Sequence, residues 1–434
     1  MLIFRNHHVA ITHEEEMHEI SDFSLQLDRI LRNRLSPASN NLRIIAVNEA
    51  LNPYEEELKQ FVKQVKTAID LVKVEGKNID EIVRKGKADP HNRIKDFYIL
   101  FEKIFKRFQF NCIENSFLDF NDLVIQAIEV LKKHEDVRKE YREKYSYVLV
   151  DEFQDVNKLQ VELLHQLLSD QTSLFCVGDD WQSIYGFRGS DIDFIVNFKN
   201  HFPNSKVTSL DINYRSTQTI VSAGNEVMKQ NIKKLNKTLH AINTDVSKIN
   251  VYVSNDEYKD GVKYVTKRID ELLHAGISSD EIMVLGRRSA MLYYYRIAIK
   301  SAMQKVTCRT IHSTKGLEAR IVFLVGLKSG SGGFPDLWLQ DRIYQIIKPQ
   351  NIDDMKEEER RLFYVAITRA KEELNLITEA NNESTYIKEI PAHFLNRVTI
   401  EVHSKAQINS CLSCGKTLFQ QVKFCSNCGA KLPD

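Results

Sequence analysis

Two adjacent carboxylates, Asp151 and Glu152, stand at the end of an apolar run in this 434-residue sequence. The run, residues 145–150, predicts a buried strand of a parallel sheet. Ligands of such sheets bind beyond the carboxyl ends of the strands. There, Asp151 could hold Mg²⁺, and Glu152 could orient or deprotonate a water that attacks a phosphate. An isolated Asp-Glu pair is more commonly part of a solvated turn. Whether these two residues form a binding site therefore depends on the surrounding sequence.

A second apolar run, residues 174–177, also ends in acidic residues. Two strands that end in acids at one edge of a sheet are what a nucleotide site needs. Spacing alone would assign the aromatic residues that follow to a core. The segment after the second run is Gly178-Asp179-Asp180-Trp181-Gln182-Ser183-Ile184-Tyr185-Gly186-Phe187-Arg188-Gly189-Ser190.

Four cysteines near the C-terminus have the spacing of a metal site. They are paired as Cys411-x₂-Cys414 and Cys425-x₂-Cys428, with ten residues between the pairs. Four thiolates at this spacing fit a tetrahedral structural Zn²⁺ site. We expect a zinc ribbon over residues 405–434, whose binding partner the sequence does not specify.

The surrounding elements indicate an α/β protein. Residues 52–110 and 158–168 have helical periodicity, whereas 249–253, 282–285, 321–327 and 374–378 have that of strands. With 60 basic and 59 acidic residues the net charge is +1, so any nucleic acid must bind in a local groove. No apolar run approaches membrane-spanning length and no signal peptide is present, which excludes a membrane partner. The cysteine usage favours a reducing cytoplasm.

The acidic segments belong to a longer series that resembles the UvrD/Rep-type superfamily-one helicases. Residues 151–155, Asp-Glu-Phe-Gln-Asp, resemble the Walker B motif, and residues 178–190 resemble motif III. Residues 210–216, 310–318 and 358–370 resemble motifs IV, V and VI in the same order. The Asp-Asp-Trp-Gln variant, with Gly332-Gly333-Phe334-Pro335 downstream, is similar to the helicase IV branch.

This resemblance implies a role for particular residues. Those implied to act on ATP and Mg²⁺ are Asp151, Glu152, Gln182, Arg215 and Arg369, with Arg369 as an arginine finger, while Tyr214 stacks on adenine and Glu318 binds the ribose. Those implied to bind DNA are Tyr185, Phe187, Arg188, His312 and Lys315, the two aromatics by stacking on bases.

The resemblance also implies two RecA-like lobes. We expect a helical subdomain with the start of the first lobe at 1–116, the rest of that lobe at 117–205, and the second lobe at 206–400. The implied activity is ATP-dependent 3′–5′ DNA unwinding in repair or replication, with single-stranded and partially duplex DNA as the binding partners. The 95 positions from Arg215 to Thr310 are too few for the subdomain that large UvrD relatives insert there.

One part of the expected machinery is missing from the sequence. A helicase of this family needs a phosphate-binding Gly-x₄-Gly-Lys-Thr loop before Walker B, and these residues contain none. We therefore expect the C-terminal portion of a helicase IV-like enzyme, completed by a separate N-terminal segment or cut off upstream. The alternative is a non-catalytic DNA-binding or adaptor protein derived from a helicase.

Overall fold

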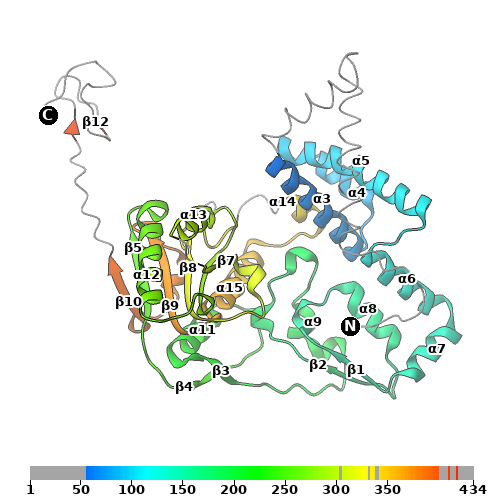
Figure 1. Ribbon diagram of the computed structural model, residues 1–434. Helices are drawn as coiled ribbons and strands as arrows, with labels where there is room; N and C mark the ends of the chain where they lie inside the picture. Colours follow the sequence, from blue (N-terminus) through cyan, green and yellow to red (C-terminus); the bar gives the residue numbers. More distant parts are fainter. Residues whose placement is uncertain are drawn as a thin grey trace, which may run out of the picture. The chain divides into compact units, whose positions relative to one another are not determined.

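The chain forms two compact units in a computed structural model that describes residues 55–302, 305–330, 333–337 and 342–399, with 409–410 and 417–418 (Figure 1). Unit 1 comprises residues up to 209 together with 231–237 and 337–362. Unit 2 comprises 210–230, 238–336 and the residues from 363 onward. The sequence-based boundaries are contiguous, whereas this division interleaves the two units along the chain.

Unit 1 begins with three helices that share a hydrophobic core: α3 (Glu55–Glu75), α4 (Ile79–Lys87) and α5 (Asn92–Asn115). Residues 88–91 separate α4 from α5. A distant helix, α14 (Arg342–Ile347), adds Ile343 and Ile347 to this core. The buried Tyr98 hydroxyl donates to the carbonyl of Ile343 at 2.6 Å. The helical subdomain is therefore completed by residues far along the sequence.

The sheet of unit 1 consists of β1 (Tyr147–Val150) and β2 (Ser173–Cys176), which are parallel. Three helices accompany it: α6 (Phe120–Lys133), α7 (Glu135–Lys144) and α8 (Lys158–Leu167). Asp119 and Asp122 form a capping box that fixes the start of α6. One face of the sheet packs on a core cluster that contains Phe153. The expectation of a fully buried strand was wrong, because Leu149, on the other face, is 73% exposed.

Unit 2 contains a six-stranded sheet in which every neighbouring pair is parallel, in the order β10-β5-β9-β8-β6-β7. Helices α12 (Val262–His274) and α13 (Tyr293–Ser301) share a buried cluster with its apolar side chains. Such nearly continuous apolar strands are typical of a parallel sheet covered by helices. The strands are β5 (Ile249–Ser254), β6 (Ile282–Gly286), β7 (Thr307–Thr310), β8 (Ala319–Val325), β9 (Ala370–Glu379) and β10 (Leu395–Thr399).

The remaining elements are α15, a second two-stranded sheet with its helix, and several short pieces. Helix α15 (Ile352–Ile367) crosses from unit 1 into unit 2 at residue 363. In unit 2, β3 (Ile212–Thr217) pairs with β4 (His240–Asn243) and is followed by α11 (Gln218–Lys229). The short pieces are α9 (Asp193–Val196), α10 (Phe198–His201), α16 (Thr385–Lys388), β11 (Asn409–Ser410) and β12 (Thr417–Leu418).

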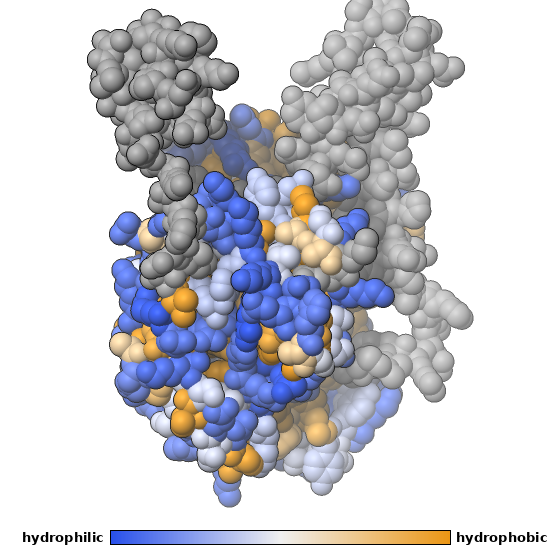
Figure 2. Space-filling model, turned by 60° about the vertical axis from the view of Figure 1, so that its left-hand side comes forward, coloured by the Kyte–Doolittle hydropathy of each residue, from blue (hydrophilic) through white to orange (hydrophobic). Residues whose placement is uncertain are grey.

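The surface is mainly polar where it can be viewed. Figure 2 shows one face on which hydrophilic side chains predominate and apolar ones occur in scattered small groups. Such scattered apolar side chains are normal for a folded protein and carry no functional meaning. Of the helices that the structure describes, none is both long enough and apolar enough to cross a bilayer.

Candidate functional site

The carboxylates of unit 1 lie just beyond β1, and the acids after β2 lie beside them. Asp151 and Glu152 are exposed, and Glu152 has a left-handed backbone with φ of 52°. The buried Gln154 connects the two strand ends: its amide N–H donates to Glu152, and its Oε1 accepts the Asp179 N–H at 2.9 Å. The predicted meeting of two acidic strand ends at one edge is confirmed for this pair of strands.

Gln182 is held at the same edge through Asp179. Its Nε2 donates to Asp179 Oδ2 at 2.6 Å. Lys237, which sequence reasoning missed, donates to Asp179 at 2.6 Å and to the fully buried Asp180 at 2.7 Å. Burial alone would lower the pKa of the Lys237 ammonium, but the charges of Asp179 and Asp180 outweigh this and raise it. No motif signals Lys237, because its partners lie more than fifty positions away.

Tyr185, Phe187 and Arg188 form one group in the following loop. The rings of Tyr185 and Phe187 are 6.1 Å apart, and both are half-buried. The Arg188 guanidinium lies 5.3 Å from the first ring and 5.6 Å from the second. A partly exposed pair of rings beside a cation is suited to stacking on bases. Neither aromatic is the fully buried core residue that spacing alone would favour.

This loop is hydrogen-bonded to the middle of α15. The Arg361 guanidinium donates to the Ser183 carbonyl at 3.0 Å, and Glu358 accepts the Gly186 N–H at 2.9 Å. A Cβ at Gly186 would lie 2.5 Å from a Glu358 oxygen, so a larger residue would displace this carboxylate from its hydrogen bond. Helix α15 therefore helps to position the segment that carries Gln182 and both aromatics.

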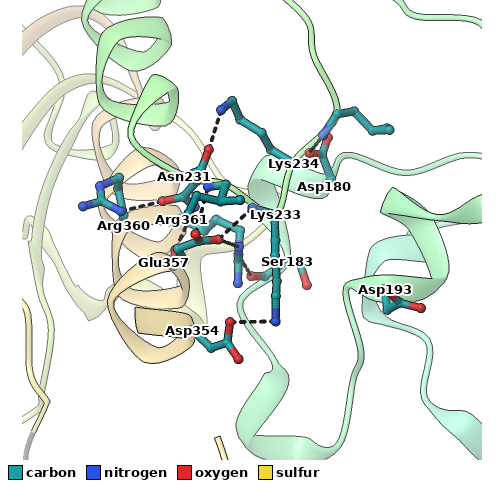
Figure 3. A network of polar contacts seen from close by, with 12 residues as sticks. Asp180, Ser183, Asp193, Asn231, Lys233, Lys234, Asp354, Glu357, Arg360 and Arg361 are labelled. Atoms are coloured by element: carbon teal, nitrogen blue, oxygen red, sulfur yellow. Dashed lines mark hydrogen bonds and ion pairs between the residues drawn. The ribbon is translucent and has the colours of Figure 1, made fainter. Parts of the chain in front are cut away.

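The segment 231–237, which we call the strap, is bound into the same network (Figure 3). The Glu357 carboxylate accepts the N–H groups of Ile232 at 2.8 Å and Lys233 at 3.1 Å. Asn231 donates to the Glu357 carbonyl and accepts from Arg360 at 2.6 Å. Asp180 accepts the N–H of Leu235, so the strap joins α15 to the loop after β2.

Unit 2 brings together the residues predicted to contact ATP from the second lobe. Arg215, on β3, is ion-paired with Glu318 at 2.5 Å, and Lys371 reaches the other Glu318 oxygen at 2.7 Å. Hydrogen bonds from Lys371 and Arg215 lower the pKa of the Glu318 carboxyl. Lys371 is a second residue that sequence reasoning missed. Tyr214, the neighbour of Arg215, is 76% exposed, as a side chain that stacks on a ligand must be.

Arg369 lies close to this group but is fully buried. Its guanidinium donates to the carbonyls of Val365 and Leu317 at 3.0 Å each. The residue stands just after the end of α15. In this conformation the guanidinium faces carbonyl oxygens of its own unit, and its role as an arginine finger stays a prediction.

The two predicted DNA contacts of unit 2 lie elsewhere on its sheet. His312 and Lys315 are half-buried in the segment that follows the carboxyl end of β7. Glu318, in contrast, directly precedes the amino end of β8. The chain between residues 310 and 319 thus runs from the carboxyl ends of the parallel strands to their amino ends. This separates the predicted DNA contacts from the predicted nucleotide contacts within the unit.

The residues present fit part of what ATP and Mg²⁺ require. Asp151 offers an exposed carboxylate that could bind Mg²⁺, and Arg215 offers a cation for phosphate oxygens. The described residues contain no group of three or more potential ligands that could hold a metal by themselves. The four cysteines predicted to bind Zn²⁺ lie outside the described residues.

The protein belongs to the α/β class. Parallel strands that end in carboxylates, and a separate group that contains arginines, are typical of α/β proteins that bind nucleotides. Comparison with known families gives the same class. Residues 3–203 match the UvrD/REP helicase N-terminal domain, and residues 208–294 and 294–381 match the UvrD-like helicase C-terminal domain. The chain belongs to the UvrD/Rep helicase family.

Individual relatives agree with this family. A probable DNA helicase of Mycoplasma pneumoniae is 29% identical over 82% of this chain and 68% of its own length. DNA helicase IV of Escherichia coli is 32% identical over 62% of this chain, and PcrA of Staphylococcus epidermidis is 35% identical over 48%. The matched regions span only 38% and 28% of those two relatives.

One solved structure, the C-terminal domain of a possible DNA helicase from Lactobacillus plantarum, overlaps with 43% of this chain and 98% of its own. Its sequence identity is 19% and its TM-score is 0.29, too low to support any detail of the fold.

Proposed function

We propose that this chain supplies the Walker B part and the second-lobe part of an ATP-dependent 3′–5′ DNA helicase. Units 1 and 2 would correspond to the two RecA-like lobes, the first of them incomplete. The observation that carries the proposal is the connected edge of Glu152, Gln154, Asp179 and Gln182 beyond two parallel strands. The family match of the chain supports it.

In this proposal each residue has a defined task. Bound ATP supplies the phosphoryl group, and Mg²⁺ neutralises charge on its oxygens. Asp151 would hold the metal, Glu152 would orient and deprotonate the attacking water, and Gln182 would sense the γ-phosphate. Arg215 and Arg369 would stabilise charge on the phosphate, since guanidinium groups bind its oxygens in pairs.

DNA and zinc complete the proposal. The ring pair of Tyr185 and Phe187 would stack on bases of single-stranded DNA, with Arg188, His312 and Lys315 along the strand. The paired cysteines would hold one structural Zn²⁺. The cysteine usage predicts a reducing cytoplasm, and in such a compartment the four thiolates could bind Zn²⁺.

The sequence contains no Gly-x₄-Gly-Lys-Thr motif, whose N–H groups and lysine would wrap the β-phosphate. Phosphoryl transfer depends on positioning and charge stabilisation, so its loss should remove catalysis almost completely. We therefore expect no DNA-stimulated ATP hydrolysis by residues 1–434 alone. A segment with a Gly-x₄-Gly-Lys-Thr loop, fused or added separately, should restore it.

Phosphate release in the presence of single-stranded DNA tests this expectation. Glu152→Gln should abolish the restored activity, whereas Glu129→Gln, at an exposed carboxylate on α6, should leave it unchanged. Clear turnover by the isolated chain that disappears with Glu152→Gln would contradict the proposal. DNA binding without any restorable turnover would support the alternative, a non-catalytic DNA-binding or adaptor protein.

A further inference from the structure

The loop that carries the aromatic pair packs on the end of α3. Residues 185–190 form a tight turn, in which the N–H of Ser190 donates to the Tyr185 carbonyl at 3.3 Å. At the end of this turn Gly189 has a positive φ of 93°, and a Cβ there would lie 2.8 Å from a methyl carbon of Val74. The turn is therefore in close contact with a helix of the helical subdomain.

Lys348 connects this turn to the same helix. Its Nζ donates to the carbonyl of Ser190 at 3.2 Å and to that of Gly189 at 3.4 Å. The same ammonium group lies 3.2 Å from a carboxylate oxygen of Glu75, the last residue of α3. The side chains of Lys348 and Glu75 are only 19% and 17% exposed, so water screens their attraction less than that of a surface pair.

The position of Lys348 is fixed by α14. Lys348 directly follows this helix, and its N–H donates to the Tyr344 carbonyl at 2.8 Å, so the residue continues the last helical turn. Ile343 and Ile347 of α14 belong to the core formed by α3, α4 and α5, and Figure 1 shows α14 beside α3. The ammonium group therefore reaches the turn from a helix that buried contacts hold in place.

We propose that Lys348 is a positioning residue for the binding of single-stranded DNA. By holding two consecutive carbonyls at the end of the turn, it keeps the rings of Tyr185 and Phe187 in the arrangement that stacks on bases. The same contacts couple DNA binding at the loop to the packing of α3 and α14. This inference rests on the proposed function, because the stacking role of the two rings comes from there.

A direct contact with a DNA phosphate is the other role that a lysine near this loop could have. An ammonium group has three hydrogen atoms to donate, and that of Lys348 already lies near three protein oxygens. Arg188, in contrast, lies within 5.6 Å of both rings and is only half-buried, so it can reach a strand that stacks on them. The geometry therefore favours positioning for Lys348 and leaves the phosphate contact to Arg188.

Binding of a labelled single-stranded oligonucleotide to the full chain tests this role. Lys348→Met should weaken binding about tenfold, because the turn loses its cation and Glu75 loses this ion pair. Lys348→Arg should retain most of the affinity, since a guanidinium can donate to the same oxygens. Lys356→Met is the matched control: this lysine of α15 forms an exposed pair with Asp353, and its loss should leave binding unchanged.

The dependence of the affinity on salt separates positioning from a phosphate contact. Each phosphate that a lysine neutralises adds about 0.7 to the slope of log affinity against log salt concentration for a single strand. Lys348→Met should therefore keep the slope of the unaltered chain, while its affinity is lower at every salt concentration. A slope reduced by about this amount, or an affinity equal to that of the unaltered chain, would overturn the positioning role.

A second measurement needs no variant. Coupling between two sites is reciprocal, so single-stranded DNA should slow hydrogen exchange at the amides of residues 72–77 and 344–348 in the unaltered chain. Exchange in α12 of unit 2 is the internal control and should not change. Unaltered exchange in the first two segments would contradict the coupling, and so would an equal slowing in α12, because that would reflect a global effect.

Phe187→Ala separates this inference from the proposed function. If Phe187→Ala weakens DNA binding and Lys348→Met does not, the positioning role fails and the stacking role of the ring stands. If neither variant changes DNA binding, this loop is not the DNA site, and that part of the proposed function fails as well.

Discussion

In the proposed function, Arg215 would have to give up its ion pair with Glu318 in order to bind phosphate. Both members are about one-third exposed, and such pairs contribute little to stability in water. A triphosphate offers more charge and a better match to the planar guanidinium than one carboxylate does. Arg215 could therefore exchange Glu318 for a phosphate at low cost, while Lys371 keeps the Glu318 charge paired.

The aromatic pair of the loop after β2 gives the first prediction at this scale. Phe187→Ala should weaken binding of single-stranded DNA by about 1–3 kcal/mol and leave the melting temperature largely unchanged, because the ring is only half-buried. Tyr293→Ala is a suitable control, since this ring is 58% exposed on α13 and has no predicted DNA role. Titration with a labelled oligonucleotide measures the affinities. Unfolding by Phe187→Ala with undiminished residual binding would identify the ring as core.

Glu257 is a buried carboxyl group at the carboxyl ends of β5 and β8. Its Oε1 accepts the Tyr295 hydroxyl at 3.1 Å and the Gly326 N–H, while its buried Oε2 makes no hydrogen bond in the described structure. Burial raises the pKa of Glu257 from 4.5 to about 7, against the opposing effect of both hydrogen bonds. The unfolded chain therefore loses this proton at a lower pH than the folded chain.

This difference predicts a specific dependence of stability on pH. Stability from Glu257 is complete below its unfolded pKa of 4.5 and is lost as the pH rises toward the folded pKa of about 7. The loss should be about 3 kcal/mol. As the pH rises from about 5 to about 8, the stability of Glu257→Gln relative to the unaltered chain should therefore increase by about 3 kcal/mol.

Urea unfolding at both pH values measures the effect. The exposed Glu372→Gln variant shows the contribution of an ordinary carboxylate. A stability difference between Glu257→Gln and the unaltered chain that does not change with pH would mean that Glu257 is ionised in both states.

At the scale of elements, the strap and α15 act on the loop after β2 from two sides. The strap neutralises Asp179 and Asp180 through Lys237, and α15 holds the loop backbone through Arg361 and Glu358. Burial lowers the pKa of the Arg361 guanidinium, but the nearby charges of Glu358 and Glu357 oppose this. The loop therefore depends on charged partners that are partly or fully buried, and losing one partner leaves another uncompensated.

Lys237→Met tests this dependence. It should lower the free energy of unfolding by about 3 kcal/mol, because it leaves two carboxylates without their cation. Lys133→Met, which removes an exposed pair with Glu129 on α6, should cost less than about 1 kcal/mol. Urea denaturation compares the two. Adding Asp180→Asn to Lys237→Met should recover part of the loss, and failure to recover any would show that the charge pairing is not the cause.

For the whole molecule, the chain passes several times between its two units. Residues 231–237 and 337–362 return to unit 1 and provide the strap, α14 and most of α15. Each return makes buried polar or apolar contacts within unit 1, such as that of Asn231 with Glu357 and that of Ile343 with the α5 core. Unit 1 therefore cannot be expressed as residues 1–209 alone without losing these partners.

The last prediction concerns the zinc content of the purified protein and depends on the four cysteines near the C-terminus. The purified protein should contain one Zn²⁺, and Cys425→Ser should lower this stoichiometry strongly, since four thiolates complete the tetrahedral site. Cys308→Ser, outside the spacing pattern, should retain the metal. Elemental analysis decides, and a zinc content near zero in protein prepared without chelator would rule out the site.

What the sequence alone determined are the features encoded by neighbouring residues. The ends of β1 and β2 and four strands of the second sheet, β5, β6, β8 and β9, follow from local periodicity. The acidic strand ends and the family were also predictable, because a parallel sheet brings its carboxyl ends to one edge. The roles assigned to individual site residues stay predictions.

Only the tertiary structure decided which distant residues meet. The pairing of Lys237 with Asp179, the insertion of α14 into the helical core and the burial of Arg369 have no local signal. Long-range contacts depend on how whole elements pack, and a short apolar strand has the same periodicity whether its second face is covered or open. For that reason the sequence predicted a buried strand at residues 145–150, and the structure instead shows Leu149 exposed.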